Sequence, residues 1–484
     1  MSPVKDSKTE QPDESAQQMY AEYVKIYPKK VKGTFRSLKT AAMWITLLVY
    51  FLSPFLRWTR GMGAPDQAIL IDLPGRRAYF FFIEIWPQEV YYLTGLLIIA
   101  AIALFFMSAL FGRLWCGYAC WQTVFTDLFI FVERFFEGDR NARIKLDRAP
   151  LSMNKLLRKA GTHGTWALIS FFVGLGFTLY FFNAPDVLTV LFGAEPSYGA
   201  WGTIAVIGSF CYLLAGWARE QVCIYMCPYS RFQGAMFDDD SLLVTYETWR
   251  GEPRAPRKLG DDFDTRGHCV DCKACVQVCP TGIDIRDGQQ LACIGCALCV
   301  DACNAVMDRF KLPRGLITWD SINNQVARSK GKTTRLHLMR VRTFVYIFVL
   351  VAVAAVMAYG LANRSTLDVK VQHDRSPLFV TLSNGHVRNG YTFKIYNKIR
   401  ADETYSLNIS GVPGATMTVI GVAETPVSTV DLAVGPDTVG TFQVYVLADP
   451  DTLKKETSDL TFTLVNKATG QSEHYDAWFT GPQK

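Results

Sequence analysis

The sequence predicts a membrane α-helical bundle of about five spans, joined to a cysteine-rich segment and to an all-β sandwich at the C-terminal end. Three observations support this fold class. Half of the residues are apolar, and they cluster in nearly uncharged stretches, as membrane spans do. Eight of the thirteen cysteines fall between residues 269 and 303. Residues 363–484 alternate apolar and polar positions between turn signals, which is typical of strands.

The apolar stretches divide the chain into parts. The five predicted spans are residues 41–57, 90–111, 166–182, 203–218 and 342–362. The predicted parts are a polar N-terminus (1–40), four spans (41–218), a basic segment (219–341), the last span (342–362) and a C-terminal domain (363–484). Residues 124–136 are also apolar, but they are short and contain Asp127 and Glu133. We expect an interfacial or re-entrant helix there, with a sixth span as the alternative.

Lysines and arginines set the expected orientation, because they gather in cytoplasmic loops. Residues 19–40 carry six of them and residues 112–165 carry nine. Residues 219–341 carry seventeen, whereas residues 183–202 carry none. Five spans then place the N-terminus and the cysteine-rich segment in the cytoplasm of a bacterium, and residues 363–484 in the periplasm. Because the charges flank apolar spans, we expect a lipid bilayer as their partner and no nucleic acid. The first apolar run starts too late for a cleavable signal peptide.

The C-terminal domain is expected to be an immunoglobulin-like sandwich. Apolar and polar residues alternate from Tyr391 to Tyr396, and Asn384-Gly385 and Asn389-Gly390 mark turns. About seven short strands of this kind in one domain are typical of such sandwiches. The domain has no cysteine and its three histidines are scattered, so we expect no catalysis in it.

The strongest motif is a repeated run of four cysteines. The runs are Cys269-x2-Cys272-x2-Cys275-x3-Cys279 and Cys293-x2-Cys296-x2-Cys299-x3-Cys303. This spacing is that of bacterial two-cluster ferredoxins, in which the fourth cysteine of each run ligates the other [4Fe-4S] cluster. The predicted ligands are Cys269, Cys272, Cys275 and Cys303 for cluster 1, and Cys293, Cys296, Cys299 and Cys279 for cluster 2. The ferredoxin-like domain should cover about residues 260–310. Zinc is the alternative, but it usually takes thiolates from two separated pairs.

A second cysteine motif occurs twice, each time just after a span. Both copies, 116–120 and 223–227, follow the pattern C-x-Y-x-C-x-x-[ST]-x-F. If each copy is helical, its two cysteines share one face. The pairs Cys116/Cys120 and Cys223/Cys227 could then bind a soft metal such as Cu(I), or cycle as disulfides. They could also only pack small side chains between helices, which is the role expected for Cys211.

With these motifs the chain resembles the cytochrome oxidase accessory family CcoG, also called FixG or RdxA. The resemblance runs through WCGYAC, CIYMCP, the two cysteine runs and the Ig-like tail. It implies a membrane polyferredoxin that reduces Cu(II) to Cu(I) for the assembly of cbb3-type cytochrome c oxidase, which would make the protein a cupric reductase. The family's CxxxCP motif maps onto Cys116, Cys120, Cys223, Cys227 and Pro228. Trp121 stands where the first copy usually has proline, so a helix could continue there.

The resemblance also implies partners, namely a copper-exporting ATPase, copper chaperones and oxidase assembly factors. The electron donor cannot be read from the sequence, and no glycine-rich nucleotide-binding motif is present. Two other functions stay open. One is a NapH-like, quinol-linked electron carrier without copper, and the other is an assembly scaffold whose clusters are structural.

Overall fold

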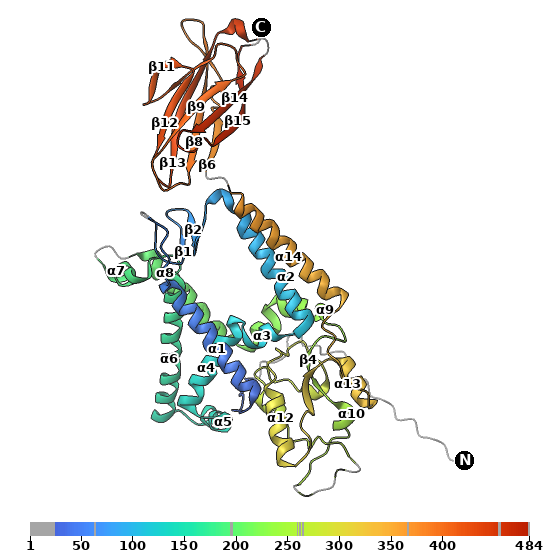
Figure 1. Ribbon diagram of the computed structural model, residues 1–484. Coiled ribbons are helices and arrows are strands. Elements are labelled where there is room, and N and C mark those ends of the chain that lie inside the picture. The colour runs from blue at the N-terminus through green and yellow to red at the C-terminus, as the bar shows by residue number, and fades with distance from the viewer. Residues whose placement is uncertain are drawn as a thin grey trace, which may run out of the picture. The chain divides into compact units, whose positions relative to one another are not determined.

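The computed structural model describes residues 25–61, 64–193, 197–258, 260, 263, 266–364, 367–453 and 456–482. Most of the predicted polar N-terminus, residues 1–24, lies outside them. The chain forms two compact units (Figure 1). The first is made of Met1–Leu56 and Gln67–Ala354, and the second of Arg57–Asp66 and Ala355–Lys484.

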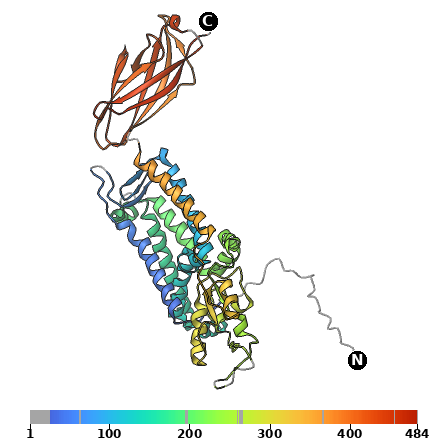
Figure 2. The same ribbon diagram turned by 45° about the vertical axis from the view of Figure 1, so that its right-hand side comes forward.

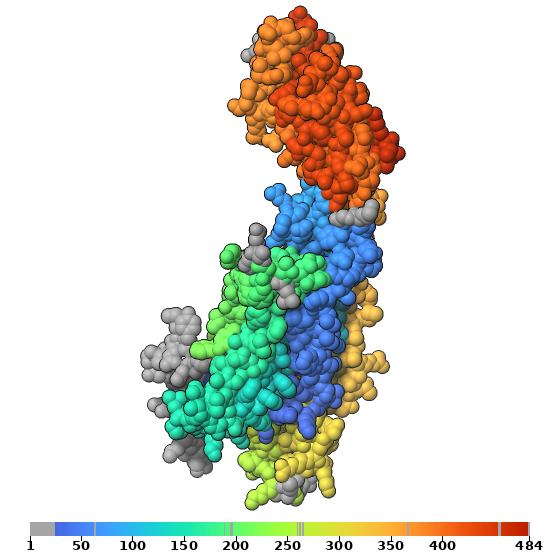
Figure 3. Space-filling model, turned by 90° about the vertical axis from the view of Figure 1, so that its left-hand side faces the viewer, coloured from blue at the N-terminus to red at the C-terminus, as the bar shows by residue number. Residues whose placement is uncertain are grey.

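Long helices build the membrane part of the first unit. They are α1 (Thr34–Leu52), α2 (Tyr91–Phe111), α4 (Trp121–Glu137), α6 (Met153–Thr178), α8 (Tyr198–Cys211) and α14 (Val341–Ala362). α14 lies beside α2 in Figures 1 and 2, and the rings of Phe106 and Tyr346 are 5.9 Å apart. Figure 3 shows the face on which α1 runs alongside α6, where the Tyr50 hydroxyl donates to the Val173 carbonyl at 2.7 Å.

Among the described residues, four helical stretches are long and apolar enough to cross a membrane. They are Thr34–Phe55, Pro87–Phe111, Tyr198–Ala218 and Val341–Ala362. Each coincides with a predicted span. The remaining predicted span, 166–182, overlaps the second half of α6. The first half of α6 carries Lys155, Arg158 and Lys159, and this polar start explains why the helix as a whole is less apolar than the other four.

Residues 124–136 form most of α4, which packs one face into the bundle and exposes the other. Val124, Phe129 and Ile130 are buried, whereas Phe131 and Phe135 are exposed. All three acidic residues of α4 are paired: Asp127 with Arg36, Glu133 with Arg143 and Arg219, and Glu137 with Lys159. Because each carboxylate has a cationic partner, the helix can be buried despite its charges. α4 is not among the membrane-crossing stretches, so no sixth span is found there.

Short helices connect these elements and build the cysteine-rich segment. They are η2 (Ser53–Phe55), η3 (Pro87–Glu89), α3 (Leu114–Tyr118), α5 (Arg140–Arg148), η4 (Ala184–Asp186), α7 (Val187–Phe192), η5 (Tyr212–Ala218), η6 (Val222–Met226), α9 (Pro228–Met236), α10 (Thr248–Gly251), α11 (Ala274–Val278), η7 (Ile285–Asp287), α12 (Leu298–Arg309), α13 (Ile322–Ser329) and η8 (Pro450–Thr452). η5 and η6 are π-helical.

The cysteine-rich segment has its own small core. β4 (Leu243–Tyr246) pairs antiparallel with β5 (Ile317–Asp320), and α11 and α12 pack beside them. Ile285, Met307 and Leu316 are nearly inaccessible to solvent in this core. The Asp301 carboxylate of α12 accepts hydrogen bonds from the backbone amides of Phe35 and Arg36. The segment is thereby fixed to the start of α1.

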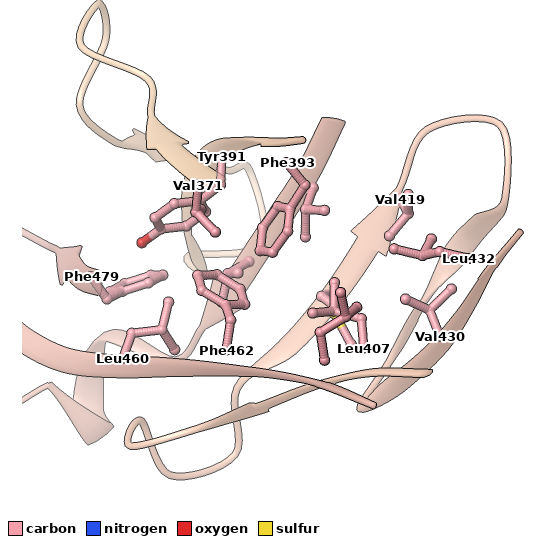
Figure 4. Close-up of a cluster of buried hydrophobic side chains, with 14 of the residues drawn as sticks. Val371, Tyr391, Phe393, Leu407, Val419, Val430, Leu432, Leu460, Phe462 and Phe479 are labelled. Carbon is pink, nitrogen blue, oxygen red and sulfur yellow. The ribbon is translucent and has the colours of Figure 1, made fainter. Parts of the chain in front are cut away.

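The second unit contains the expected sandwich. One sheet has the order β11-β10-β13-β8-β6 with β7 on β8, and the other has the order β12-β9-β14-β15. The strands are β6 (Leu367–His373), β7 (Val380–Thr381), β8 (Val387–Asn397), β9 (Glu403–Ser410), β10 (Thr416–Val419), β11 (Ala423–Val427), β12 (Thr429–Val434), β13 (Thr438–Ala448), β14 (Thr457–Asn466) and β15 (Ser472–Thr480). Tyr391, Phe393 and Phe462 meet between the sheets (Figure 4). The alternation predicted for residues 391–396 is confirmed.

A small sheet between α1 and α2 was not predicted. It consists of β1 (Ile69–Asp72), β2 (Arg77–Phe80) and β3 (Ile83–Ile85) in the order β1-β2-β3. The Ile71 amide donates to the Tyr180 carbonyl at 2.8 Å. This hydrogen bond joins the sheet to the chain just beyond the end of α6.

Candidate functional site

The eight cysteines between residues 269 and 303 gather in two groups. Cys303 interacts electrostatically with Cys275, Cys269 and Cys272 of the first run. The other group consists of Cys279, Cys293, Cys296 and Cys299, which interact electrostatically with one another. These four line one small cavity, and Cys275 of the first group also borders it. In each group the fourth cysteine comes from the opposite run, as the predicted exchange of ligands requires. The ligand roles themselves stay a prediction.

The two runs share a backbone conformation that suits them to a large cofactor. The second residue after the first cysteine is left-handed in both, with φ of 47° at Asp271 and 67° at Gly295. The fourth residue is left-handed too, with φ of 52° at Lys273 and 56° at Ala297. This conformation costs a non-glycine residue roughly 1–2 kcal/mol, and such strain concentrates at functional sites. In the second loop the Gly295 amide donates to Cys293 Sγ at 3.4 Å.

A [4Fe-4S] cluster fits the donor set around the small cavity. Besides five thiols, the cavity is lined by Thr281 and by apolar side chains, among them Ile283, Ile285 and Ile294. Burial raises the pKa of the Cys293 and Cys303 thiols to about 12. Metal binding must therefore displace their protons.

The spacing of the thiols does not resemble a zinc site. Among the described residues, no three His, Cys, Asp or Glu side chains are close enough to hold a single metal ion. Sulfurs around one Zn²⁺ would lie about 3.8 Å apart, because Zn–S bonds measure about 2.3 Å. A four-iron cubane spreads its thiolates more widely than that.

The repeated cysteine pairs are not continuous helices. α3 ends at Tyr118 and α4 begins at Trp121, so Cys120 is the extended N-cap residue between them. Cys227 is likewise the extended N-cap of α9. The expectation that a helix could continue through Trp121 is wrong, because the chain breaks there even without a proline. The two copies therefore have matching conformations at their second cysteine.

The four paired cysteines come together in space, and we call Cys116, Cys120, Cys223 and Cys227 the cysteine quartet. Cys116 interacts electrostatically with Cys120 and Cys223, and Cys223 interacts with Cys120 and Cys227. Burial raises the pKa of Cys116 to about 12 and that of Cys223 to about 11. All thirteen cysteines are free thiols. The quartet gathers four soft sulfur donors, but among the described residues no three are close enough to hold one metal ion, so at most two of these thiols meet one ion in this arrangement.

The first copy of the motif lies directly against the cluster 2 loop. A Cβ atom on Gly117 would lie 3.0 Å from the Ile294 carbonyl oxygen and 3.1 Å from that of Gly295. The Tyr118 hydroxyl donates to the Cys296 carbonyl at 3.1 Å. Tyr118 is buried, so its ring lies inside the protein rather than at a membrane interface. Cys116 and Cys223 pack in one apolar cluster with Ile294 and Cys296.

Arg113 was not predicted, yet it joins the quartet to cluster 2. Its guanidinium donates to the carbonyls of Leu291, Cys293 and Ser230. It also interacts electrostatically with Cys293 and with Cys116, Cys223 and Cys227 of the quartet. The signal in the sequence was a single arginine, three residues before Cys116, at the end of an apolar span.

Arg286 has a corresponding place beside cluster 1. Its Nη1 lies 4.0 Å from Cys269 Sγ and 2.6 Å from an Asp271 carboxylate oxygen, and Asp284 completes the ion pair. A positive charge next to a cluster favours the reduced, more negative state. The two clusters thus each have a buried arginine beside a predicted ligand.

Four further residues lie beside the cysteine motifs or in the helical bundle. His268 accepts a hydrogen bond from Arg250 Nε at 2.9 Å, and Tyr225 is 51% exposed. Cys211 packs against the apolar cluster between α1, α4 and α6. His163 shares a hydrogen bond with the Tyr212 hydroxyl.

Comparisons with known families cover all three cysteine motifs and the tail. A family described as a 4Fe-4S dicluster domain matches residues 218–322. A family described as a 4Fe-4S binding domain matches residues 93–137, and one described as an IG-like fold at the C-terminal of FixG matches residues 357–482.

Several proteins resemble the whole chain. The nitrogen fixation protein FixG of Rhizobium meliloti (strain 1021) is 42% identical over 96% of this chain and 94% of its own length. The protein RdxB of Cereibacter sphaeroides is 42% identical over 97% of this chain and 99% of its own length. A crystal structure of a FixG-related protein from Vibrio parahaemolyticus aligns with 24% of this chain and 96% of its own, at 23% identity and a TM-score of 0.21.

Proposed function

The chain belongs to the FixG and Rdx family of membrane iron–sulfur electron-transfer proteins, and we propose that its cysteine quartet reduces Cu(II) to Cu(I). Each [4Fe-4S] cluster, when bound, exchanges one electron. A cluster held by Cys279, Cys293, Cys296 and Cys299 would supply the one electron that converts one Cu(II) to one Cu(I). The main observation in support of this proposal is that four thiols gather beside the cluster 2 loop.

The chemistry of the quartet suits the softer product ion, Cu(I). Thiolates bind Cu(I) more strongly than Cu(II), which raises the potential of the copper couple and favours reduction. The quartet is partly buried, so the bound ion is shielded from water. Arg113 offsets the negative charge that accumulates when the quartet thiols lose their protons.

The contacts around Gly117 support a short route for the electron. The chain from Cys116 to Tyr118 touches the loop that carries Ile294 and Cys296, with no side chain between the two backbones at Gly117. We assign cluster 2 as the direct donor to copper, and cluster 1 as the cluster that takes electrons up first or holds the second one.

Contacts within the first unit support five spans with the quartet on the cytoplasmic side. The Lys29 amide donates to the Gln277 carbonyl at 2.8 Å, so the N-terminal segment and the cluster segment lie on one side. Glu133 of α4 binds both Arg143 and Arg219, which precede α6 and follow α8 respectively. An even number of crossings must separate these arginines, and α6 therefore crosses together with α8. The final span then puts the sandwich in the periplasm of a bacterial inner membrane.

The family resemblance extends the proposal to partners. Cu(I) formed at the quartet would pass through copper chaperones to a copper-exporting ATPase and serve assembly factors of a cbb3-type oxidase. The sandwich, which contains no cysteine, would contact a periplasmic partner rather than handle the metal.

A single comparison of variants tests the reaction. The purified protein is reduced with dithionite under anaerobic conditions, freed of excess reductant and mixed with Cu(II), and Cu(I) is measured with a chromogenic chelator. A variant with serine at Cys116, Cys120, Cys223 and Cys227 should keep its iron and sulfide but form no Cu(I) above the buffer rate. The variant Cys211→Ser, which changes a cysteine outside the quartet, should behave as wild type. Undiminished Cu(I) formation by the quadruple variant would exclude the quartet from the reaction.

A further inference from the structure

A cavity of about 700 Å³ lies between α4, α6 and η5, apart from the cysteine quartet. Its lining includes Glu137, Lys159, His163, Trp166, Leu213 and Arg219. The volume is in the range of pockets that bind small organic molecules, about 300–1,000 Å³. Most of the exposed lining is apolar, and a few polar groups converge on it. We call it the α4–α6 cavity.

The cavity is accessible to an apolar ligand from the membrane. η5 is the end of a stretch, Tyr198–Ala218, that is long and apolar enough to span the bilayer. Leu213 and Trp217 line the cavity and are 52% and 67% exposed, so their outer faces meet lipid. The π-helical winding of η5 also departs from an ordinary helix at this wall, a feature frequent at functional sites.

His163 provides a proton acceptor at the cavity. Its Nδ1 shares a hydrogen bond of 2.9 Å with the Tyr212 hydroxyl, which fixes the ring. In the tautomer whose Nδ1–H donates to that hydroxyl, Nε2 is the proton acceptor. The edge of the ring packs against Trp166, with centroids 5.0 Å apart. The Trp166 ring is buried against Phe129, with centroids 5.1 Å apart, and the Arg219 guanidinium lies over it. A ligand hydroxyl would therefore meet the held imidazole of His163 at the cavity wall rather than lie along Trp166.

A chain of polar groups leads from the cavity to the surface. Glu137, which lines the cavity, accepts from Thr162 Oγ1 at 3.0 Å and pairs with Lys159 at 2.8 Å. Lys159 also pairs with Asp147 at 2.7 Å, and Asp147 pairs with Lys25, whose side chain is 41% exposed. Protons released in the cavity thus have a polar route to water.

The cavity is also connected to the cluster segment. Arg219 lines it and lines a second, smaller cavity that borders Cys223, Pro280 and Ile294. Pro280 and Ile294 each adjoin a predicted ligand of cluster 2, Cys279 and Cys293. Arg219 therefore lies between the α4–α6 cavity and the residues that adjoin cluster 2.

We propose that the α4–α6 cavity binds a membrane quinol, which supplies the electrons for the clusters. The quinol gives up two electrons and two protons and leaves as the quinone. Each of the two [4Fe-4S] clusters accepts one electron, and the protons leave through His163 and the Glu137–Lys159–Asp147 chain. This inference rests on the proposed function only for copper as the final electron acceptor, because the two clusters together would accept both electrons of the quinol.

The charge beside cluster 2 favours this direction of transfer. Quinols are mild reductants, so they reduce only clusters whose potentials are raised. Arg113 beside Cys293 places a buried positive charge next to a predicted ligand of cluster 2, whereas the charge of Arg286 beside Cys269 is offset by its ion pairs with Asp271 and Asp284. The Arg113 charge stabilises the reduced cluster and raises its potential.

Two measurements on the cluster-loaded, detergent-purified protein test the proposal. Saturable quenching of tryptophan fluorescence by decylubiquinone reports binding, since Trp166 and Trp217 line the cavity. Anaerobic loss of the clusters' visible absorbance after addition of decylubiquinol reports electron transfer. Menadiol, used in parallel, distinguishes a naphthoquinol site from a benzoquinol site.

Three variants are compared with wild type. His163→Phe should slow cluster reduction by the quinol about a hundredfold, as loss of a general base does. Leu213→Trp should weaken quinone binding about tenfold by filling apolar space. His337→Phe changes a histidine that is 59% exposed and bound to Asp240, outside the cavity, and should leave both readouts unchanged.

The outcomes separate this inference from the proposed function. Dithionite reduces the clusters without the cavity, so all three variants should still form Cu(I) when dithionite is the donor. Absence of saturable quinone binding in wild type, or equal reduction rates in wild type, His163→Phe and Leu213→Trp, would overturn the quinol site. Quinol-dependent cluster reduction without any Cu(I) formation would support the site and contradict the copper reaction.

Discussion

At the scale of single residues, Gly117 determines how closely the cysteine quartet approaches the cluster 2 loop. The backbone at Gly117 lies against the carbonyls of Ile294 and Gly295, and any side chain would separate the two segments. The neighbouring Tyr118 adds a hydrogen bond to the same loop. A glycine inside a helical turn usually destabilises the helix. At Gly117 the missing side chain allows the close contact with the cluster 2 loop.

Substitution of this glycine should loosen the contact. Gly117→Ala places a methyl group about 3 Å from two backbone oxygens, and such overpacking costs about 1–3 kcal/mol. We expect a lower unfolding temperature and slower transfer to Cu(II), with the cluster content unchanged. Gly164→Ala is the matched control, because nothing lies within 4 Å of a Cβ there. Equal unfolding temperatures for the two variants would argue against the close contact.

The raised pKa values of the quartet predict how copper affinity depends on pH. The Cys116 and Cys223 thiols have pKa values of about 12 and about 11, against an ordinary 9.0, because they are buried. Both are protonated at neutral pH and must lose a proton to bind the metal. We expect Cu(I) affinity, measured by competition with a chelator, to rise with pH by about a hundredfold per unit between about pH 6 and pH 8. A pH-independent affinity would contradict ligation by these two thiols.

The raised pKa values of Cys116 and Cys223 also determine how the folding stability of the metal-free protein changes with pH. The folded state holds these two protons more tightly than the unfolded state does. Their stabilising contribution is therefore fully present below about pH 9 and is lost as the pH rises through the folded pKa values of about 11 and about 12. Urea unfolding of the metal-free double variant Cys116→Ser/Cys223→Ser should show a weaker loss of stability above pH 9 than wild type.

At the scale of elements, the ion pairs of α4 hold three parts of the bundle together. Glu133 contacts Arg143 of α5 and Arg219 at the end of η5, and all three are nearly inaccessible. Glu133→Gln would leave two buried guanidinium groups without a carboxylate, which costs about 3–5 kcal/mol. Thermal unfolding in detergent should show the loss clearly. The exposed pair of Asp431 and Lys467 is the control, since Asp431→Asn should cost less than about 1 kcal/mol. A similar small loss for Glu133→Gln would show that the pairs do not secure the bundle.

How far the elements could be predicted depends on whether their cause is local. The period of two from Tyr391 to Tyr396 has a local cause, because alternate residues enter the core, and it predicted β8 correctly. The burial of α4 depends on Arg36, Arg143 and Arg219, which are distant in the sequence. The pattern of residues 124–136 alone is apolar with two acidic residues, and it therefore predicted an interfacial or re-entrant helix. The break at Cys120 likewise has no proline to announce it.

How far the candidate site could be predicted from the sequence also depends on whether the cause is local. The spacing of the cysteines predicted which thiols would gather, because tight loops fix their neighbours along the chain. Arg113 and Gly117 could not be identified from the sequence, since each acts through a contact with residues about 180 positions later, between Leu291 and Cys296. The α4–α6 cavity arises from three separate helical elements, and no local pattern predicts it.

At the scale of the whole molecule, the chain divides the work between two units. The first unit contains every cysteine, all of the predicted ligands and the α4–α6 cavity, and the second contains the sandwich. As proposed here, the first unit transfers electrons from a donor in the membrane to a metal ion. A scaffold with structural clusters would need none of these connections.

Electron transfer from the clusters to copper at the quartet is tested most directly by stopped-flow mixing of the reduced protein with Cu(II) under anaerobic conditions. Cluster oxidation is followed by the return of visible absorbance, and Cu(I) is followed with a chelator. The account predicts that in wild type the two signals rise at one rate, with one Cu(I) formed for each electron lost from a cluster, and that the quadruple serine variant of the quartet loses this coupling. Clusters that stay reduced in the presence of Cu(II), or equal rates in wild type and the variant, would contradict it.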